Sequence, residues 1–221
     1  MELPPLKLDA DGLVTVVAQD RLTGEIRMLA HADEAALRRT AETGLAHFFS
    51  RSRQRSWQKV EESGNTLAVV EIWLDCDADA AVYLVDPSGP TCHTGRPSCF
   101  FHRVSPAPAS ADDGARALPV LSALESALAR RRTSAAGKSY TRSLLDAGAP
   151  KIGAKLREEA DELARALAEE SEARVAAEAA DVVYHLMVGL LHRGVPLAAV
   201  QAELARRFGT SGHEEKASRS R

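Results

Sequence analysis

Residues 74–100, with the sequence LDCDADAAVYLVDPSGPTCHTGRPSCF, contain all three cysteines of a chain of 221 residues. The run AAVYLVD at 80–86 is rich in β-branched and aromatic residues, which is typical of a β-strand. Cys76 precedes this run, and Cys92 and Cys99 follow it in a loop rich in glycine and proline. The sequence therefore predicts Cys76 at the end of a strand and the other two thiols in a loop.

Around this stretch, the first half of the chain has the pattern of short strands and the second half has helical periodicity. Predicted strands cover 13–20, 25–30, 46–52, 66–75 and 80–86, with a helix at 32–44 between Asp33 as N-cap and Gly44. Predicted helices cover 118–132, 149–170, 171–194 and 196–208. The predicted fold class is α+β: a β-rich domain at 1–106, a linker at 107–117, and an all-α domain at 118–221 with a disordered tail.

Composition excludes several classes of protein. The net charge of −3 provides no overall basic field, so no nucleic-acid partner is expected. No apolar run reaches about 18 residues, so no membrane partner is expected. The start MELPPLKLDADG lacks the regions of a signal peptide, so we expect a cytoplasmic protein. Thiols stay reduced there, and clustered cysteines more often bind a metal than pair with each other.

The three cysteines are candidate zinc ligands. A closed structural zinc site has four Cys or His ligands, whereas a catalytic site keeps one position for water. His93 could be a fourth ligand, but adjacent residues rarely bind one ion together. The preferred interpretation makes His93 a general acid or base, or a substrate contact. The alternative is three buried cysteines without a metal, since their spacings match no common zinc ribbon.

Three aspartates surround the first cysteine. In a strand, Asp75, Asp77 and Asp79 would share one face, with Cys76 on the other. Oxygen ligands alone suit a hard cation such as Mg²⁺. The alternative is a solvated edge of a strand and turn without any ion.

Four stretches resemble the phosphoribosyl-AMP cyclohydrolases of histidine biosynthesis: VVAQDRLTGEIRMLA, TGLAHFFSRSRQRSWQK, ESGNTLAVVEIWLDCDAD and GPTCHTGRPSCF, over about 10–103. In that family the matching cysteines bind zinc in a site built across a homodimer, and the aspartates form a magnesium site. The resemblance implies hydrolytic opening of the adenine ring between N1 and C6. Two positions depart from the family pattern: LAHAD replaces LAYMN at 29–33, and Val60 replaces a glycine.

The substrate implied by this resemblance carries phosphate and needs cationic and hydrogen-bonding partners. Arginines at 51, 53 and 55 would share one face of a strand, although the alternative is a solvated strand face. The candidate substrate-binding residues are Arg51, Ser52, Arg53, Lys59, Ser63, Gly64 and Asn65.

Acidic residues also recur in the helical half. Glu158, Glu159 and Glu162 lie on one predicted helix, and Glu178 and Asp181 lie three residues apart on the next. If these helices face each other, the carboxylates could converge on a divalent cation. The alternative is a set of solvated glutamates, but an unpaired Asp181 inside the apolar run AADVVYHLMVGLL would be costly.

The stretches GKSYTRSLLDAGAPKIGAKLREEADE and EAADVVYHLMVGLL resemble the phosphoribosyl-ATP pyrophosphohydrolases of the MazG-like superfamily, over about 118–207. The resemblance implies that Mg²⁺ is held by Glu158, Glu159, Glu162, Glu178 and Asp181, with Glu159 catalytic. Water would attack between the α- and β-phosphates. Candidate phosphate-binding residues are Lys138, Ser139, Tyr140, Thr141 and Lys155; the alternative makes the first four a linker and a helix cap.

The two resemblances support each other, since phosphoribosyl-AMP is the product of one activity and the substrate of the other. Together they imply a bifunctional histidine-biosynthesis enzyme with Zn²⁺ and Mg²⁺ as cofactors. Its partners would be phosphoribosyl-ATP, phosphoribosyl-AMP and a second copy of the chain. One alternative is a cyclohydrolase fused to a housekeeping nucleotide pyrophosphohydrolase. Another is a non-catalytic, zinc-stapled dimerisation module, which leaves the basic run and Asp181 unexplained.

Overall fold

The computed structural model describes residues 3–59, 64–102, 117–133 and 139–208. The chain divides into two compact units, Met1–Pro119 and Val120–Arg221, the first rich in strands and the second helical. This arrangement confirms the predicted α+β class. The predicted linker, except its last residue, and the predicted disordered tail lie outside the described residues.

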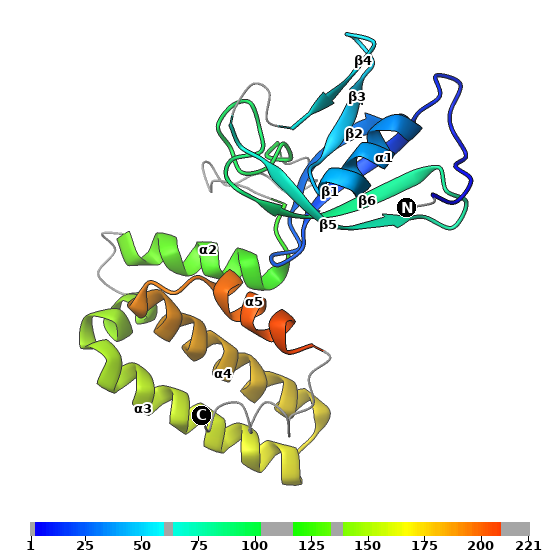
Figure 1. The fold of residues 1–221 in the computed structure, drawn as a ribbon. Helices are drawn as coiled ribbons and strands as arrows, with labels where there is room; N and C mark the ends of the chain where they lie inside the picture. Colours follow the sequence, from blue (N-terminus) through cyan, green and yellow to red (C-terminus); the bar gives the residue numbers. More distant parts are fainter. Residues whose placement is uncertain (1–2, 60–63, 103–116, 134–138, 209–221) are drawn as a thin grey trace, which may run out of the picture. The chain divides into compact units, whose positions relative to one another are not determined.

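The strand-rich unit is built on one six-stranded sheet with the order β4-β3-β2-β1-β6-β5 (Figure 1). The strands are β1 (Val14–Asp20), β2 (Ile26–Ala32), β3 (His47–Ser50), β4 (Arg55–Gln58), β5 (Leu67–Leu74) and β6 (Ala80–Pro87). Neighbours pair in antiparallel fashion except β1 and β6, which are parallel. The antiparallel hairpin of β5 and β6 therefore places β5 at one edge of the sheet.

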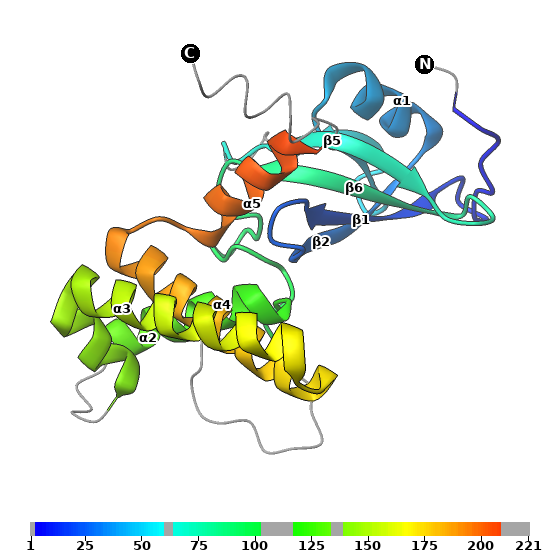
Figure 2. The same ribbon diagram turned by 90° about the horizontal axis from the view of Figure 1, so that it is seen from below.

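The core of this unit follows from alternation along the central strands. In β1 every second residue is buried, including Val14 and Val16, and in β6 Tyr83 and Val85 are fully buried. The helix α1 (Glu34–Thr43) packs on one face of the sheet through Leu37 (Figure 2). Burial of one face of each strand fixes the register of the sheet.

Both ends of α1 were correctly predicted from the sequence. The Asp33 carboxylate accepts a hydrogen bond from the Ala36 N–H at 2.7 Å. Gly44 ends the helix in the left-handed conformation, with φ at 67°, and its N–H bonds to the Thr40 carbonyl. A side-chain oxygen at the start and a glycine at the end are the usual solutions for unpaired backbone groups at helix termini.

A buried ion pair lies beside the loop that carries Cys92 and Cys99. Glu25 is 1% exposed, and its Oε2 lies 2.7 Å from Nη1 of Arg27, whose side chain is 9% exposed. Arg27 also contacts the loop, because its carbonyl accepts a hydrogen bond from the Cys99 N–H at 2.9 Å. Buried charges of this kind are tolerated only when paired.

Replacing Arg27 by methionine is expected to destabilise the strand-rich unit by about 3–5 kcal/mol, because it leaves the buried Glu25 carboxylate without the guanidinium. Urea unfolding followed by tryptophan fluorescence measures this, since both tryptophans, Trp57 and Trp73, lie in this unit. The double variant Glu25→Leu/Arg27→Met should recover most of the loss. A loss below about 1 kcal/mol in the single variant would show that the pair contributes little to stability.

The helical unit contains α2 (Val120–Thr133), α3 (Tyr140–Glu169), α4 (Glu172–Arg193) and α5 (Leu197–Arg207), as Figure 1 shows. The helices α3 and α4 are joined by a two-residue connection and pack against each other. Leu128, Leu144 and Val188 are central members of the hydrophobic core. Helix α3 begins nine residues before the predicted helix at 149–170, and non-helical backbone at Gly148 kinks it.

Among the described helices, α4 is the one whose length and mean hydropathy of 1.2 would suffice to cross a membrane. It also carries the buried residues Glu178 and His185 and contributes Met187 and Val188 to the core. Packing against α3 in the core of the unit accounts for part of its apolar composition.

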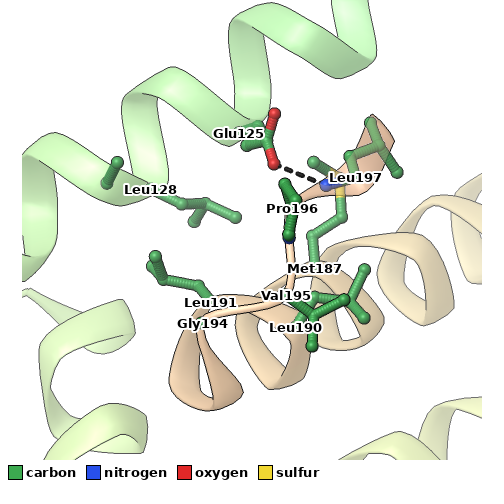
Figure 3. A pocket seen from close by; sticks show the side chains of 10 residues that line it. Glu125, Leu128, Met187, Leu190, Leu191, Gly194, Val195, Pro196 and Leu197 are labelled. Atoms are coloured by element: carbon green, nitrogen blue, oxygen red, sulfur yellow. Dashed lines mark hydrogen bonds between the residues drawn. The ribbon is translucent and has the colours of Figure 1, made fainter. Parts of the chain in front are cut away.

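An apolar pocket of about 500 Å³ lies between α2, the end of α4 and the start of α5 (Figure 3). Its acidic residue Glu125 accepts a hydrogen bond from the Leu197 N–H at 2.7 Å. Because Pro196 precedes α5 and offers no side-chain acceptor, this carboxylate caps the helix from another element. Among the described residues that line the pocket none is cationic, so these residues offer no positive charge to bind phosphate.

Candidate active sites

The loop after β6, residues 88–100, is called the thiol loop here. Cys92 is buried, and the Thr94 hydroxyl donates a hydrogen bond to its Sγ at 3.1 Å, which lowers the pKa of the Cys92 thiol. Burial, followed by the neighbouring Cys92, raises the pKa of Cys99 to about 11. The two thiols are therefore close enough to influence each other, and a cation between them would favour the ionised form of both.

Cys76 lies at the opposite end of β6 from this pair. β6 has eight residues, which at about 3.3 Å per residue span roughly 25 Å. Among the described residues, no cysteine belongs to a group of three or more potential metal ligands that converge. A single chain thus brings together Cys92 and Cys99 but not Cys76.

His93 is exposed on the thiol loop, with its Nδ1 3.9 Å from Sγ of Cys92. It therefore lies beside a candidate ligand, as its predicted role as a proton carrier requires. The ammonium group of Lys59 also acts on this pair, where it favours the ionised form of both thiols.

The three aspartates converge, but not for the predicted reason. Oxygens of Asp75, Asp77 and Asp79 lie within 4.8 Å of one another. The residues form a turn between β5 and β6 rather than one face of a strand, and the predicted strand 66–75 ends at Leu74. The turn is held by the carboxylate of Asp75, which accepts hydrogen bonds from the Asp79 N–H at 3.0 Å and from the next N–H at 3.1 Å.

Lys7 is a cation at this turn that the sequence did not reveal. Its ammonium group contacts Asp77 and lies 3.3 Å from Oδ2 of Asp79. The hydrogen bond to Lys7 lowers the pKa of the Asp77 carboxyl. The aspartates are thus partly neutralised by a side chain from the N-terminal segment.

The basic run does not form the predicted continuous strand. Residues 51–54 form a turn, with Gln54 at a φ of 48°, and β4 starts only at Arg55. The prediction that Arg51, Arg53 and Arg55 share one strand face is therefore wrong. Arg51, Ser52 and Arg53 instead lie together on an exposed hairpin turn, where the Ser50 hydroxyl accepts a hydrogen bond from the Arg53 N–H at 3.2 Å.

Asn65 connects the predicted phosphate-binding segment to the thiol loop. Its Nδ2 donates a hydrogen bond to the Pro90 carbonyl at 3.0 Å. A Cβ on Gly89 would lie 2.5 Å from Oδ1 of Asn65, so any other residue there would push the Asn65 side chain aside. Gly64 precedes Asn65 with a φ of 68°, and Ser63 lies outside the described residues.

In the helical unit, carboxylates from two helices converge. Oxygens of Glu159 on α3 and of Glu178 and Asp181 on α4 lie within 4.8 Å of one another. These three residues are called the carboxylate cluster. Glu159 and Glu178 are buried, which is unusual for glutamates in alanine-rich helices. Glu158 and Glu162, also predicted as ligands, lie outside the cluster and are more exposed.

Two cations are paired with the buried glutamates. Nζ of Lys155 lies 2.7 Å from Glu159 and 3.0 Å from Glu158, and the hydrogen bond to Glu159 raises the pKa of Lys155. Arg174 contacts Glu178 and lies 3.0 Å from Glu170. Lys155 was predicted as a phosphate contact. Arg174 was missed, although the sequence shows that it lies four residues from both Glu170 and Glu178.

The start of α3 lies beside the carboxylate cluster. Ser139 is the N-cap residue, and its hydroxyl makes no capping hydrogen bond. The hydroxyl of Tyr140 lies 3.1 Å from Nε2 of His185, and partial burial raises the pKa of this tyrosine. Thr141 is buried, with its hydroxyl 2.8 Å from that of Tyr184. Lys138 lies outside the described residues.

The chain is a bifunctional hydrolase by class. Its strand-rich unit contains two neighbouring thiols, and its helical unit contains the carboxylate cluster. The family model described as phosphoribosyl-AMP cyclohydrolase matches residues 28–101, and that described as phosphoribosyl-ATP pyrophosphohydrolase matches residues 121–208. The chain belongs to the family of histidine biosynthesis bifunctional proteins HisIE, and it contains the cyclohydrolase and the pyrophosphohydrolase of that family.

Relatives with this name align with both units. The HisIE protein of Wolinella succinogenes is 41% identical over 212 residues, covering 94% of this chain and 93% of its own. That of Aquifex aeolicus is 38% identical over 206 residues, covering 92% and 98%. A chloroplastic relative from Arabidopsis thaliana is 40% identical over 227 residues, covering 99% of this chain and 80% of its own.

Proposed function

We propose that the helical unit hydrolyses phosphoribosyl-ATP to phosphoribosyl-AMP and pyrophosphate, and that the strand-rich unit then opens the adenine ring of phosphoribosyl-AMP between N1 and C6. One observation carries this proposal: the two units contain ligand sets of different chemistry. The helical unit gathers carboxylates, which suit Mg²⁺, and the strand-rich unit pairs thiols, which suit Zn²⁺.

The residues of the helical unit fit magnesium, because the converging ligand atoms are all carboxylate oxygens and two of the three residues are buried. Glu159, Glu178 and Asp181 would hold the ion, with Glu158 and Glu162 as further ligands. When bound, magnesium offsets the negative charge of the phosphates and orients the attacking water.

The start of α3 would hold the substrate of the helical unit. Ser139, Tyr140 and Thr141 are the first residues of the helix, where backbone N–H groups and the helix dipole favour an anion. Lys155 would turn from its glutamate partners to a phosphate oxygen. Lys138 lies outside the described residues, and its contact with a phosphate remains a prediction.

Zinc fits the thiol loop only in part, since one chain brings two of the three thiols together. Cys92 and Cys99 of one copy and Cys76 of a second copy would complete the site, which makes the active form a homodimer. β5, at an edge of the sheet with Val70 and Trp73 exposed, offers an apolar surface for a second copy. When bound, zinc makes hydroxide available near neutral pH by lowering the pKa of water.

The neighbours of the thiol loop would bind and orient phosphoribosyl-AMP. His93 would move a proton during attack at C6, because it lies beside Cys92 and is exposed. Lys59, together with Gly64 and Asn65, lies near the thiol loop, and Arg51, Ser52 and Arg53 form the hairpin turn. These groups and Ser63 would bind the phosphates.

The aspartate turn is a candidate magnesium site for the strand-rich unit. Asp75, Asp77 and Asp79 provide oxygen ligands alone, and Lys7 already supplies a positive charge there. A bound ion would displace Lys7 from Asp77 and Asp79. A cytoplasmic location of the enzyme is part of the proposal; one relative, from Arabidopsis thaliana, is named chloroplastic.

The test is a time course with the full chain, phosphoribosyl-ATP, Mg²⁺ and Zn²⁺, which follows pyrophosphate and the absorbance of the opened product. Pyrophosphate is expected first, with the absorbance rising after a lag. Chelation should stop both signals; Mg²⁺ alone should restore pyrophosphate release, and zinc should be needed for ring opening. Equal rates with ATP and phosphoribosyl-ATP would instead favour a housekeeping pyrophosphohydrolase. Failure to open added phosphoribosyl-AMP would refute the second step.

A further inference from the structure

His185 is a buried polar residue in the helical unit that the proposed mechanism does not use. It lies on α4, is 4% exposed, and has a partner on each ring nitrogen. Nδ1 lies 2.9 Å from the Asp181 carbonyl oxygen and 3.8 Å from Oε1 of Glu159. Nε2 lies 3.1 Å from the hydroxyl of Tyr140. His185 therefore joins two members of the carboxylate cluster to the start of α3.

The partners determine which nitrogen carries hydrogen. A backbone carbonyl only accepts hydrogen bonds, so Nδ1 must donate to Asp181. In the neutral ring Nε2 is then an acceptor, and the Tyr140 hydroxyl must be its donor. The hydroxyl of Tyr140 consequently has a fixed direction, with its hydrogen toward α4.

Tyr140 is held in place but not enclosed. Its side chain is 51% exposed, while its ring lies edge-on to that of His185 at 6.0 Å and stacks on Tyr184 at 6.4 Å. One side of the ring is therefore fixed by α4, and the other remains accessible to a ligand at the carboxylate cluster. A side chain with this combination can contact a substrate without a large loss of conformational freedom on binding.

We infer that His185 is a positioning residue for the pyrophosphohydrolase: it fixes the Tyr140 hydroxyl beside the carboxylate cluster so that Tyr140 contacts phosphoribosyl-ATP. The inference rests on the proposed function, which places the substrate at the start of α3. It assigns His185 no contact with substrate or metal. His185 acts through Tyr140 alone.

A neighbouring pair provides a matched control. Thr141 and Tyr184 form a second hydrogen bond between the same two helices, at 2.8 Å. Neither member of that pair belongs to the carboxylate cluster. Tyr184→Phe removes one interhelical hydrogen bond of the same kind but keeps the ring that packs against Tyr140 and His185, so it measures the effect of loosening α3 from α4.

The experiment uses the full chain and measures KM and kcat for pyrophosphate release from phosphoribosyl-ATP. His185→Asn keeps a donor for the Asp181 carbonyl but loses the acceptor for Tyr140, and we expect KM to rise about tenfold with a smaller change in kcat. Tyr140→Phe should give a similar rise. The double variant should be no worse than Tyr140→Phe, because His185 acts through that hydroxyl.

Two further variants separate positioning from stability. His185→Gln places an amide near the position of Nε2 and should recover most of the KM. Tyr184→Phe should lower the melting temperature of the helical unit about as much as His185→Asn, and it serves as the control for stability alone, because its partner Thr141 is itself a proposed substrate contact.

Additive effects in the double variant, or a KM that His185→Gln does not recover, would overturn the inference. Wild-type protein that releases no pyrophosphate would instead refute the proposed function, and ring opening of added phosphoribosyl-AMP reports separately on the other unit.

Discussion

Pyrophosphate release from phosphoribosyl-ATP is expected to fall by about 10²–10³-fold or more when Glu159 is replaced by glutamine. Glu159 belongs to the carboxylate cluster, is buried, and accepts a hydrogen bond from Lys155 at 2.7 Å. The amide has nearly the same shape but no charge, so the side chain would no longer attract a divalent cation. The measurement is the rate of pyrophosphate release at saturating Mg²⁺.

Glu169→Gln is the matched control for this variant. Glu169 lies on the same helix and is exposed, so its replacement should leave the rate within about twofold. Isothermal titration with Mg²⁺ gives a second reading that does not depend on turnover, and it should show weaker binding only in Glu159→Gln. Unchanged binding and rate in Glu159→Gln would remove Glu159 from the site.

Ring opening of phosphoribosyl-AMP should be lost in Cys99→Ser, with pyrophosphate release unchanged. Serine is nearly the size of cysteine but is a poor zinc ligand, because its hydroxyl stays protonated near neutral pH. Phosphoribosyl-AMP should therefore accumulate when the variant is given phosphoribosyl-ATP. The absorbance of the opened product measures the loss, and the zinc content of the purified protein should fall with it.

Mixing two inactive variants tests whether the thiols come from different copies. In a hybrid dimer of Cys76→Ser and Cys99→Ser chains, one of the two sites would receive three intact thiols. Random exchange makes half of the dimers hybrid, so about a quarter of the wild-type rate should return. No recovery after demonstrated subunit exchange would contradict the shared site, as would zinc retained at wild-type content in Cys99→Ser.

Local patterns predicted most of the fold. The strands β1, β2, β5 and β6 and the helix α1 begin and end within about two residues of the predicted ranges, because alternation and capping are local properties. The predicted strand at 46–52 corresponds to β3, but β4 was missed, since pairing of β3 with β4 requires a turn at 51–54. Nothing in the local sequence distinguishes that hairpin from one longer strand.

The kink in α3 shows a similar limit. The predicted helix at 149–170 begins directly after Gly148 and contains Pro150, and both residues disfavour the interior of a helix. The helix instead starts at Tyr140 and bends at Gly148. Packing of Leu144 into the core explains why the earlier segment is helical, and such packing is a tertiary effect.

The candidate sites were predictable as sets of residues but not as arrangements. Spacing identified Glu159, Glu178 and Asp181 as ligands, but it did not distinguish them from Glu158 and Glu162, which lie outside the cluster. Which face of α3 turns toward α4 depends on packing between helices, and spacing along one helix does not specify it. His185 was not among the predicted site residues, and its tyrosine partner lies 45 residues away in the sequence.

The pairing of Lys155 and Arg174 with buried glutamates has a consequence for metal uptake. Without cationic neighbours, the carboxylates of such a site would repel each other when no metal is bound, and the site would unfold locally. Here each buried glutamate already has a positive neighbour, so loading with a divalent ion would be an exchange of cations. The helical unit can therefore stay folded when no divalent cation is bound. Its apparent affinity for such a cation should be weaker than the number of carboxylates suggests, because the cation must displace Lys155 and Arg174.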